Sequence, residues 1–161
     1  LDQFEEIIKR EKPDKIVLLG DLLYHGYTKE YAYSLENQAN IYNKYKDKII
    51  GIRGNCDSGL DEELLKFPLN QYVRLKIGEK WYFFTHGHIY NITNVPPMCD
   101  VLVYGHYHIN FIRQKDNIYF INPGSLSLPR EGTSNSYLVI EDNQVIIKDL
   151  HGDVIMQKEI I

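Results

Sequence analysis

The sequence has little of what a disulfide-stapled or membrane-spanning protein needs. Its 161 residues include only two cysteines, Cys56 and Cys99, which predicts no disulfide scaffold. A reduced, cytoplasmic protein is the simpler interpretation of that cysteine content. No run of eighteen apolar residues occurs, so no membrane-spanning helix is predicted. Excess positive charge is also lacking: the net charge is −4, which argues against a long nucleic acid as partner.

The length and the apolar content predict one soluble domain over residues 1–161. Hydrophobic residues make up 43% of the chain and charged residues 25%, as is ordinary for a globular protein. A chain of this length can bury roughly two-thirds of its unfolded surface. We find no internal repeat, low-complexity segment or linker that would divide the chain.

Helix and strand patterns alternate in the first third of the chain. Apolar residues at helical spacing predict a helix around Phe4, Ile7 and Ile8, and two more over residues 29–46 and 61–67. Short apolar runs predict buried strands at residues 16–19 and 48–52. The remainder is strand-rich, with hairpins predicted at 73–77 with 81–85, 111–114 with 118–121 and 136–140 with 145–149, and single strands at 100–104 and 154–160. This pattern favours two packed sheets with helices outside.

Polar side chains of the kind that bind metals follow four of the apolar runs. Asp21 follows residues 16–19, Asn55 follows residues 49–52, His86 follows residues 81–85, and His106 and His108 follow residues 101–105. Because ligands bind outside the carboxyl ends of strands in α/β sheets, we expect these side chains to converge at one edge.

The mixture of donor atoms indicates which cations such a site would hold. Asp21 offers an anionic oxygen that can bridge two cations, Asn55 a neutral oxygen, and the histidines imidazole nitrogens. This set suits Mn²⁺, Fe or Zn²⁺ and is too rich in nitrogen for Ca²⁺ or Mg²⁺ alone. Taken singly, a histidine after a strand is more often a hydrogen-bonded polar residue, and Asp21 after Gly20 a helix N-cap. Their joint occurrence at four strand ends favours the metal site.

Several motifs resemble those of a known family. They are Leu19-Gly20-Asp21, Arg53-Gly54-Asn55-Cys56-Asp57-Ser58, Thr85-His86-Gly87-His88, Tyr104-Gly105-His106 and Asn122-Pro123-Gly124-Ser125. In this order they resemble the calcineurin-like metallophosphoesterases and, more closely, the small bacterial and archaeal phosphodiesterases of the YfcE type. The resemblance spans nearly the whole chain.

The resemblance implies an α/β fold, namely a four-layer α/β/β/α sandwich of two mixed sheets flanked by helices. It also implies two divalent metal ions, Mn²⁺ first, with Zn²⁺, Fe or Ni²⁺ as alternatives. Asp21 would bridge both ions, Asn55, His86 and His106 would complete one site, and His108 would belong to the other. The implied activity is hydrolysis of a small phosphodiester through a metal-bridging hydroxide.

Three further residues are candidates for catalysis. Arg53 can grip a phosphate oxygen, with a surface ion pair as the alternative. His88 can donate a proton to the leaving group, or make a hydrogen bond that orients a metal ligand. Cys56 stands where many family members have histidine, and it assists the leaving group poorly; the alternative is a thiolate ligand.

The chain departs from the family at its start. Family members carry Asp-x-His at the end of a first strand, and this sequence has no such motif. With Asp21 and His108 alone, the first metal would have too few ligands for tight binding. We therefore expect a domain that lacks its first strand here, with about fifteen residues preceding Leu1 in the intact protein.

Other interpretations stay open at this point. A non-catalytic scaffold is the main alternative, because a retromer subunit resembles this family and uses the fold for protein contacts. A nuclease acting on short nucleotide diesters fits the same chemistry. A homo-oligomer is also open. Tyr24, His25 and residues 27–33 are candidate walls for a substrate.

Overall fold

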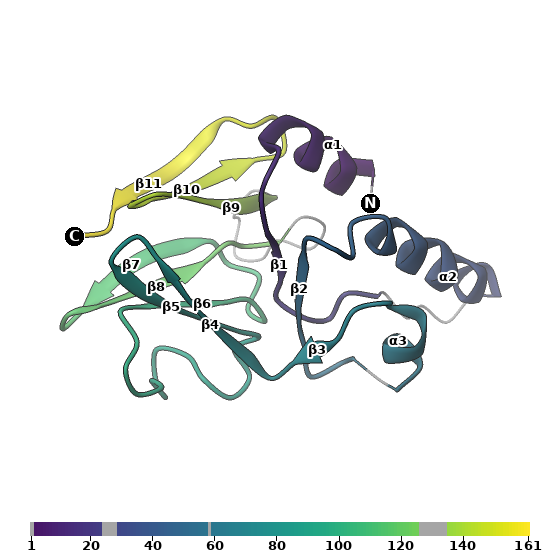
Figure 1. Ribbon diagram of the computed structural model, residues 1–161, viewed down its shortest axis with the longest axis horizontal. Coiled ribbons are helices and arrows are strands. Elements are labelled where there is room, and N and C mark those ends of the chain that lie inside the picture. The colour runs from purple at the N-terminus through teal and green to yellow at the C-terminus, as the bar shows by residue number, and fades with distance from the viewer. Residues whose placement is uncertain (1, 24–28, 58, 126–134) are drawn as a thin grey trace.

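The first half of the protein forms a small parallel sheet covered by helices (Figure 1). The computed structural model describes residues 2–23, 29–57, 59–125 and 135–161. The elements of this half are α1 (Asp2–Glu11), β1 (Ile16–Leu18), α2 (Lys29–Asn43), β2 (Ile49–Ile52), α3 (Gly59–Leu64) and β3 (Leu69–Asn70). The strands run parallel in the order β1-β2-β3.

The second half contains a five-stranded sheet and an antiparallel three-stranded sheet. The five strands are β4 (Tyr72–Ile77), β5 (Lys80–Thr85), β6 (Val101–Tyr104), β7 (Phe111–Lys115) and β8 (Ile118–Asn122). Their order is β4-β5-β6-β8-β7, with β5, β6 and β8 parallel and a hairpin partner at each edge. The last sheet has the order β11-β10-β9, from β9 (Ser136–Glu141), β10 (Gln144–Asp149) and β11 (Val154–Glu159).

The main core lies between the five-stranded sheet and the other two sheets. Side chains alternate across β5 and β6, as strand geometry requires. Tyr82 and Val103 face inward, where they join Val17 of β1 and Val145 of β10 in one buried cluster. This face therefore locks all three sheets together.

Two smaller clusters cover the outer surfaces. Helices lie on the face of the parallel sheet that points away from the five-stranded sheet (Figure 1), and Phe4, Leu35 and Ala39 pack there on Ile49. On the outer face of the five-stranded sheet, a cluster of buried aromatic and aliphatic side chains is covered by the loop of residues 86–100; it contains Phe83, Leu102, Tyr104 and Phe120, with Tyr90, Ile92 and Cys99 packed on it.

The mixed α/β class expected from the sequence is confirmed, and most predicted helices and strands are present. Strand β3 was missed, because two half-buried residues carry too little pattern to register. The four-layer order that the resemblance implies stays a prediction. Within the described residues the strands form three separate sheets, and a loop containing Pro96 and Pro97 lies on the outer face of the five-stranded sheet. None of the described helices is both long and apolar enough to cross a membrane.

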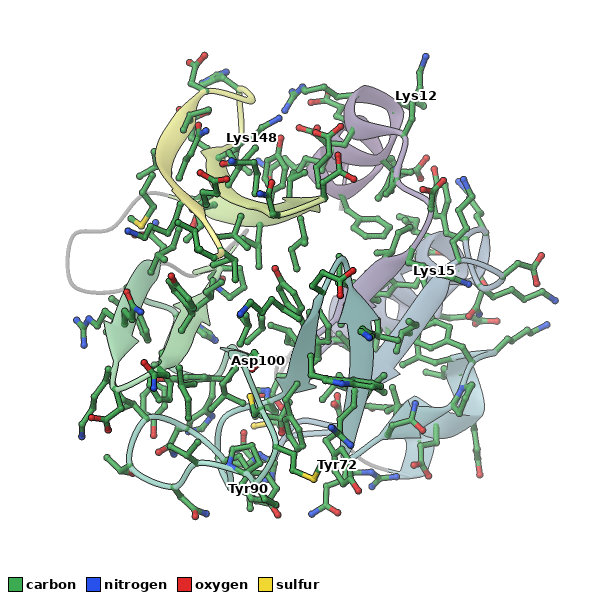
Figure 2. All side chains as sticks on the ribbon, turned by 60° about the vertical axis from the view of Figure 1, so that its left-hand side comes forward. Lys12, Lys15, Tyr72, Tyr90, Asp100 and Lys148 are labelled. Atoms are coloured by element: carbon green, nitrogen blue, oxygen red, sulfur yellow. The ribbon has the colours of Figure 1, made fainter. Side chains whose placement is uncertain are left out.

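Glu11 connects α1 to the C-terminal sheet. Its carboxylate accepts hydrogen bonds from the hydroxyl of Tyr137 on β9 at 2.7 Å and from the ammonium of Lys148 on β10 at 2.9 and 3.1 Å. Figure 2 shows Lys148 on the side of the molecule where α1 lies. Burial alone would raise the pKa of Glu11, but these hydrogen bonds outweigh it, so the pKa is lowered from 4.5.

We expect Glu11→Gln to lower the free energy of unfolding by about 1 kcal/mol at pH 7, because it removes charge-assisted hydrogen bonds. The difference from the wild type should be full above the ordinary carboxyl pKa of 4.5 and vanish as the pH falls through the lowered pKa. Urea denaturation across that range measures it. Glu6→Gln, at an exposed position on the same helix, is the control and should show no such difference.

Candidate metal centre

Four polar side chains meet where β1, β2, β5 and β6 end. Nε2 of His86 is the centre of the group. It lies 2.9 Å from Oδ1 of Asn55, 3.1 Å from Nδ1 of His106 and 3.1 Å from Oδ2 of Asp21. The structure thus brings together residues that lie 20 to 65 positions from His86 along the chain.

The spacing of these atoms fits a bound cation. Ligand atoms of Asp21, His86 and His106 all lie within 4.8 Å of one another. Around a cation with octahedral coordination and ligands at about 2.1 Å, neighbouring ligand atoms are about 3 Å apart. The observed separations of 2.9 to 3.1 Å match that value. One carboxylate, one amide and two imidazoles also form the mixed oxygen and nitrogen set that Mn²⁺, Fe and Zn²⁺ accept.

His86 is held in the orientation and tautomer that a ligand needs. Its side chain is 2% exposed, and its Nδ1 lies 2.6 Å from the carbonyl oxygen of Leu19. Because a carbonyl oxygen can only accept, Nδ1 carries the proton, so in the neutral ring Nε2 carries the lone pair and directs it at the group. A hydrogen bond of this type fixes both the ring and its donor atom.

Electrostatics within the group favour an anionic Asp21 and a neutral His106. Burial alone would raise the pKa of Asp21, but hydrogen bonds from His86 and from the Cys56 amide lower it. Burial and the charge of His86 lower the pKa of His106. For His86, burial alone would lower the pKa, but Asp21 and the Leu19 carbonyl raise it. The carboxylate and the neutral imidazole are the forms that bind metals.

Two glycines allow the loops after β1 and β2 to touch. A Cβ on Gly20, which has φ +98°, would lie 2.6 Å from the amide nitrogen of Gly54 and 2.8 Å from Nδ1 of His86. A Cβ on Gly54 would lie 2.2 Å from Oδ1 of Asp21. Both positions therefore require glycine, and their close approach sets Asp21 beside His86.

Asp57 has a structural role at the site that sequence analysis did not assign. Its carboxylate accepts hydrogen bonds from the backbone amides of Gly54 (2.7 Å), Asp21 (3.0 Å) and Leu22 (3.2 Å). Asp21 reciprocates, since its Oδ1 accepts from the amide of Cys56 at 2.8 Å. The two loops are thus joined in both directions, and Asp21 is held at φ +51°, a conformation that costs energy for a non-glycine residue. In the sequence, the only sign of this role was the position of Asp57 in the Asn55-Cys56-Asp57 motif.

Asn122 supports the turn that carries His106. It is fully buried, and its side-chain amide donates to the carbonyl oxygen of Gly105 at 2.9 Å. His106 and His108 both have positive φ, +64° and +59°, so this turn needs support from outside itself. The sequence indicated only a turn at Asn122, because the link to Gly105 crosses from β8 to the end of β6.

The two other histidine candidates lie beside the central group. His88 is exposed, with its ring centroid 5.3 Å from that of His86 and 6.3 Å from that of His106. His108 is half-buried and lies outside the group of three residues whose spacing could hold a metal ion, although it contributes electrostatically to the lowered pKa of His106. Both rings border the site and do not converge on Nε2 of His86.

Cys56 and Arg53 lie near Asn55 in the sequence, and their side chains have different environments. The Cys56 side chain is exposed, and partial burial together with the charge of Asp21 raises the pKa of its thiol. Arg53 forms an ion pair with Glu62 of α3. Tyr24, His25 and Tyr27, named above as substrate walls, lie outside the described residues, as do the side chains of residues 29–34.

The sequence has relatives of known class. Residues 1–144 match the calcineurin-like phosphoesterase superfamily domain. Phosphodiesterase YfcE of Escherichia coli K12 is 36% identical over 146 residues, which cover 88% of this chain and 79% of that protein. A probable metallophosphoesterase of Mycoplasma genitalium is 30% identical over 155 residues, covering 90% and 82%.

Solved structures share the fold. That of YfcE, a phosphoesterase from E. coli, has a TM-score of 0.90 at 31% identity and covers 99% of this chain and 91% of its own. Vacuolar protein sorting 29 from Cryptosporidium parvum has a TM-score of 0.61 at 22% identity, covering 99% and 88%, a likeness of fold alone. From the family match, the similarity to YfcE and the convergent side chains, this chain belongs to the calcineurin-like phosphoesterase superfamily.

Proposed function

We propose that this protein is a metal-dependent phosphodiesterase that hydrolyses a small phosphodiester. The observation that carries the proposal is the convergence of Asp21, Asn55 and His106 on Nε2 of His86 at 2.9 to 3.1 Å. Similarity to the phosphodiesterase YfcE supports the reaction class. Bound divalent cations supply charge neutralisation for a phosphoryl group and make water acidic enough to attack it at neutral pH.

The residues have separate tasks in this proposal. Asp21, Asn55, His86 and His106 would hold one cation, and Asp21 and His108 would contribute to holding a second. Mn²⁺ is the first choice for both, with Zn²⁺, Fe or Ni²⁺ as alternatives, because the donor set mixes oxygen and nitrogen.

Three side chains at the rim act on the substrate. Arg53 exchanges its ion pair with Glu62 for a phosphate oxygen, since both side chains are 43% exposed and free to move in solvent. His88 donates a proton to the leaving group from its exposed position beside His86. Cys56 assists weakly, because burial and Asp21 raise the pKa of its thiol and make it a poor proton donor.

A small substrate in a reducing compartment fits the rest of the chain. The net charge of −4 disfavours a long polyanion such as nucleic acid. Cys56 and Cys99 are both free thiols, as expected for a cytoplasmic protein.

A scaffold function is the second candidate, and one surface supports it. Tyr72 of β4 and the loop residues Pro96, Pro97 and Met98 line one apolar surface at the β4 edge of the five-stranded sheet, where Met98 is 80% exposed. Tyr72 and Tyr90 border one hollow there and lie close together in Figure 2. Exposed apolar surface of this kind marks protein contacts in other proteins.

Removing a ligand should abolish both metal binding and activity. We expect Asp21→Ala or His86→Ala to lower Mn²⁺-stimulated hydrolysis of bis(p-nitrophenyl) phosphate by more than about 100-fold, because even groups that only orient a ligand are worth 10- to 100-fold. Calorimetric titration with Mn²⁺ should show the parallel loss of affinity. His151→Ala, an exposed histidine outside the site, is the matched control. Full activity in either ligand variant would contradict the proposal and favour the scaffold.

Asp57→Asn should weaken metal binding without unfolding the protein. The amide keeps the shape of the carboxylate but has only one accepting oxygen for the three backbone amides of Gly54, Asp21 and Leu22. We expect Mn²⁺ affinity to fall roughly 10-fold, as for other groups that orient a metal ligand. The control is Asp116→Asn, at an exposed hairpin position with φ +58° that asparagine tolerates. Equal affinity in Asp57→Asn and the wild type would show that Asp57 has no part in positioning Asp21.

A proton-donating His88 should matter most for poor leaving groups. We expect His88→Ala to retain Mn²⁺ affinity and to lower kcat about 100-fold for an alkyl leaving group, while p-nitrophenolate departure changes much less. Comparing kcat for a dialkyl and an aryl diester measures this. An equal loss for both substrates, together with weaker Mn²⁺ binding, would assign His88 to orienting a ligand instead.

A further inference from the structure

A cavity of about 400 Å³ opens beside the metal centre, on the outer face of the five-stranded sheet. Tyr104 at the end of β6, Tyr107, and Phe111 and Arg113 on β7 form its walls, and residues 91–93 close one side. Its volume lies within the range of small-molecule sites. Neither the metal site nor the proposed catalytic residues account for this cavity.

The walls are aromatic rings packed edge to face. The ring centroid of Tyr104 lies 6.2 Å from that of Tyr107 and 5.8 Å from that of Phe111, with interplanar angles of 80° and 70°. Tyr104 is 2% exposed and belongs to the buried cluster of that face, with Phe111 packed on the cluster, whereas Tyr107 is exposed. Rings in such an arrangement leave faces on which a planar ligand can stack, and every nucleobase has a π face.

Arg113 gives the cavity a positive, hydrogen-bonding rim. Its guanidinium lies 4.5 Å from the centroid of the Phe111 ring, which keeps the charge over the aromatic wall. By contrast, Asn91 is used internally: it donates to the Gly87 carbonyl and accepts from the amide and hydroxyl of Thr93. The cavity therefore suits a planar aromatic ligand that carries an acceptor at one edge, for which Arg113 is the donor.

One turn separates the cavity from the metal centre. The rings of His106 and Tyr107 are adjacent, with centroids 4.9 Å apart and an interplanar angle of 77°. His106 meets His86 on one side of the turn, and Tyr107 lines the cavity on the other. The turn is held in place by the hydrogen bond from Asn122 to the Gly105 carbonyl. The ring of Tyr107 thus lies between the ligand group and the cavity.

We propose that this cavity binds the nucleobase of a nucleotide phosphodiester whose phosphate lies at the metal centre. The inference rests on the proposed function and names its substrate class. The base stacks on Phe111 and Tyr107, and a ring carbonyl accepts a hydrogen bond from Arg113. The rim charge also favours an anionic substrate on a chain that is negative overall.

The test compares three diesters that share the p-nitrophenolate leaving group: the thymidine 5′-, the phenyl and the methyl p-nitrophenyl phosphates. We expect the Mn²⁺-loaded wild type to have the highest kcat/KM for the thymidine ester. Phe111→Leu, which keeps an apolar side chain but removes the stacking face, should lower the thymidine-to-methyl ratio about tenfold. Arg113→Gln should lower the thymidine-to-phenyl ratio, because the phenyl ester has no ring carbonyl.

Two additional variants test whether a changed ratio reflects loss of binding and not a defect in folding. Tyr107→Leu changes a ring that is 43% exposed and should lower the thymidine-to-methyl ratio as Phe111→Leu does. Tyr72→Leu removes a tyrosine of similar exposure, 47%, at the opposite edge of the sheet and should leave all ratios unchanged. A wild type that hydrolyses the thymidine and methyl esters equally well, or Phe111 and Tyr107 variants with unchanged ratios, would overturn the inference.

A binding measurement separates this inference from the proposed function. Saturation-transfer NMR with thymidine on the metal-free protein reports on the cavity without any reaction. Transfer that is present in the wild type and lost in Phe111→Leu supports the cavity assignment. If in addition none of the three diesters is hydrolysed, only the proposed reaction is contradicted. Absence of transfer in the wild type would overturn the cavity assignment, whatever the activity.

Discussion

The hydrogen bond between Nδ1 of His86 and the carbonyl oxygen of Leu19 is the contact on which the centre depends. It joins the end of β5 in the five-stranded sheet to the end of β1 in the parallel sheet at 2.6 Å. A buried imidazole without such a partner would leave a polar atom unpaired, which costs about 1–3 kcal/mol. The same bond directs Nε2 at Asp21, Asn55 and His106. This one hydrogen bond therefore stabilises the interface between the two sheets and also sets the geometry of the ligand group.

Around that contact, backbone groups position the site residues, a role that long side chains have in many other sites. Gly20 and Gly54 let two loops approach until their atoms touch, and Asp57 then joins the loops through three amides. Such an arrangement leaves Asp21 little freedom, so its carboxylate is positioned before any cation binds. Preorganisation of this kind reduces the entropy lost on binding. The cluster of positive φ angles at Asp21 and His106 is the strain that accompanies it.

The five-stranded sheet separates two kinds of surface. Its inner face is locked against the other sheets by an apolar core, and its outer face presents aromatic side chains under a proline-containing loop. The turn after β6 passes between these environments, so His106 belongs to the polar centre while the neighbouring Tyr107 belongs to the aromatic cavity. In the function we propose, this two-residue span connects the phosphate site with the site for the organic group.

The α/β class, most helices and strands, and the residue types that stand where strands end could be predicted from the amino-acid sequence. These features are local: an apolar run of four residues and the polar residue that follows it can be seen without any partner. The sequence also predicted that Asp21, Asn55, His86 and His106 would meet, because carboxyl ends of strands share an edge. Their function as metal ligands stays a prediction that metal titration can test.

Contacts between distant segments could not be predicted in this way. The ion pair of Arg53 with Glu62, the amides bound by Asp57 and the support that Asn122 gives to Gly105 all depend on which segments pack together. The aromatic cavity joins β6, β7 and residues 91–93 in the same way. The periodicity of apolar residues indicates which face of a helix or strand a side chain lies on. It does not indicate which residue, dozens of positions away, that side chain contacts. Hydrogen-bond partners and cavities therefore became visible only once the sheets were assembled.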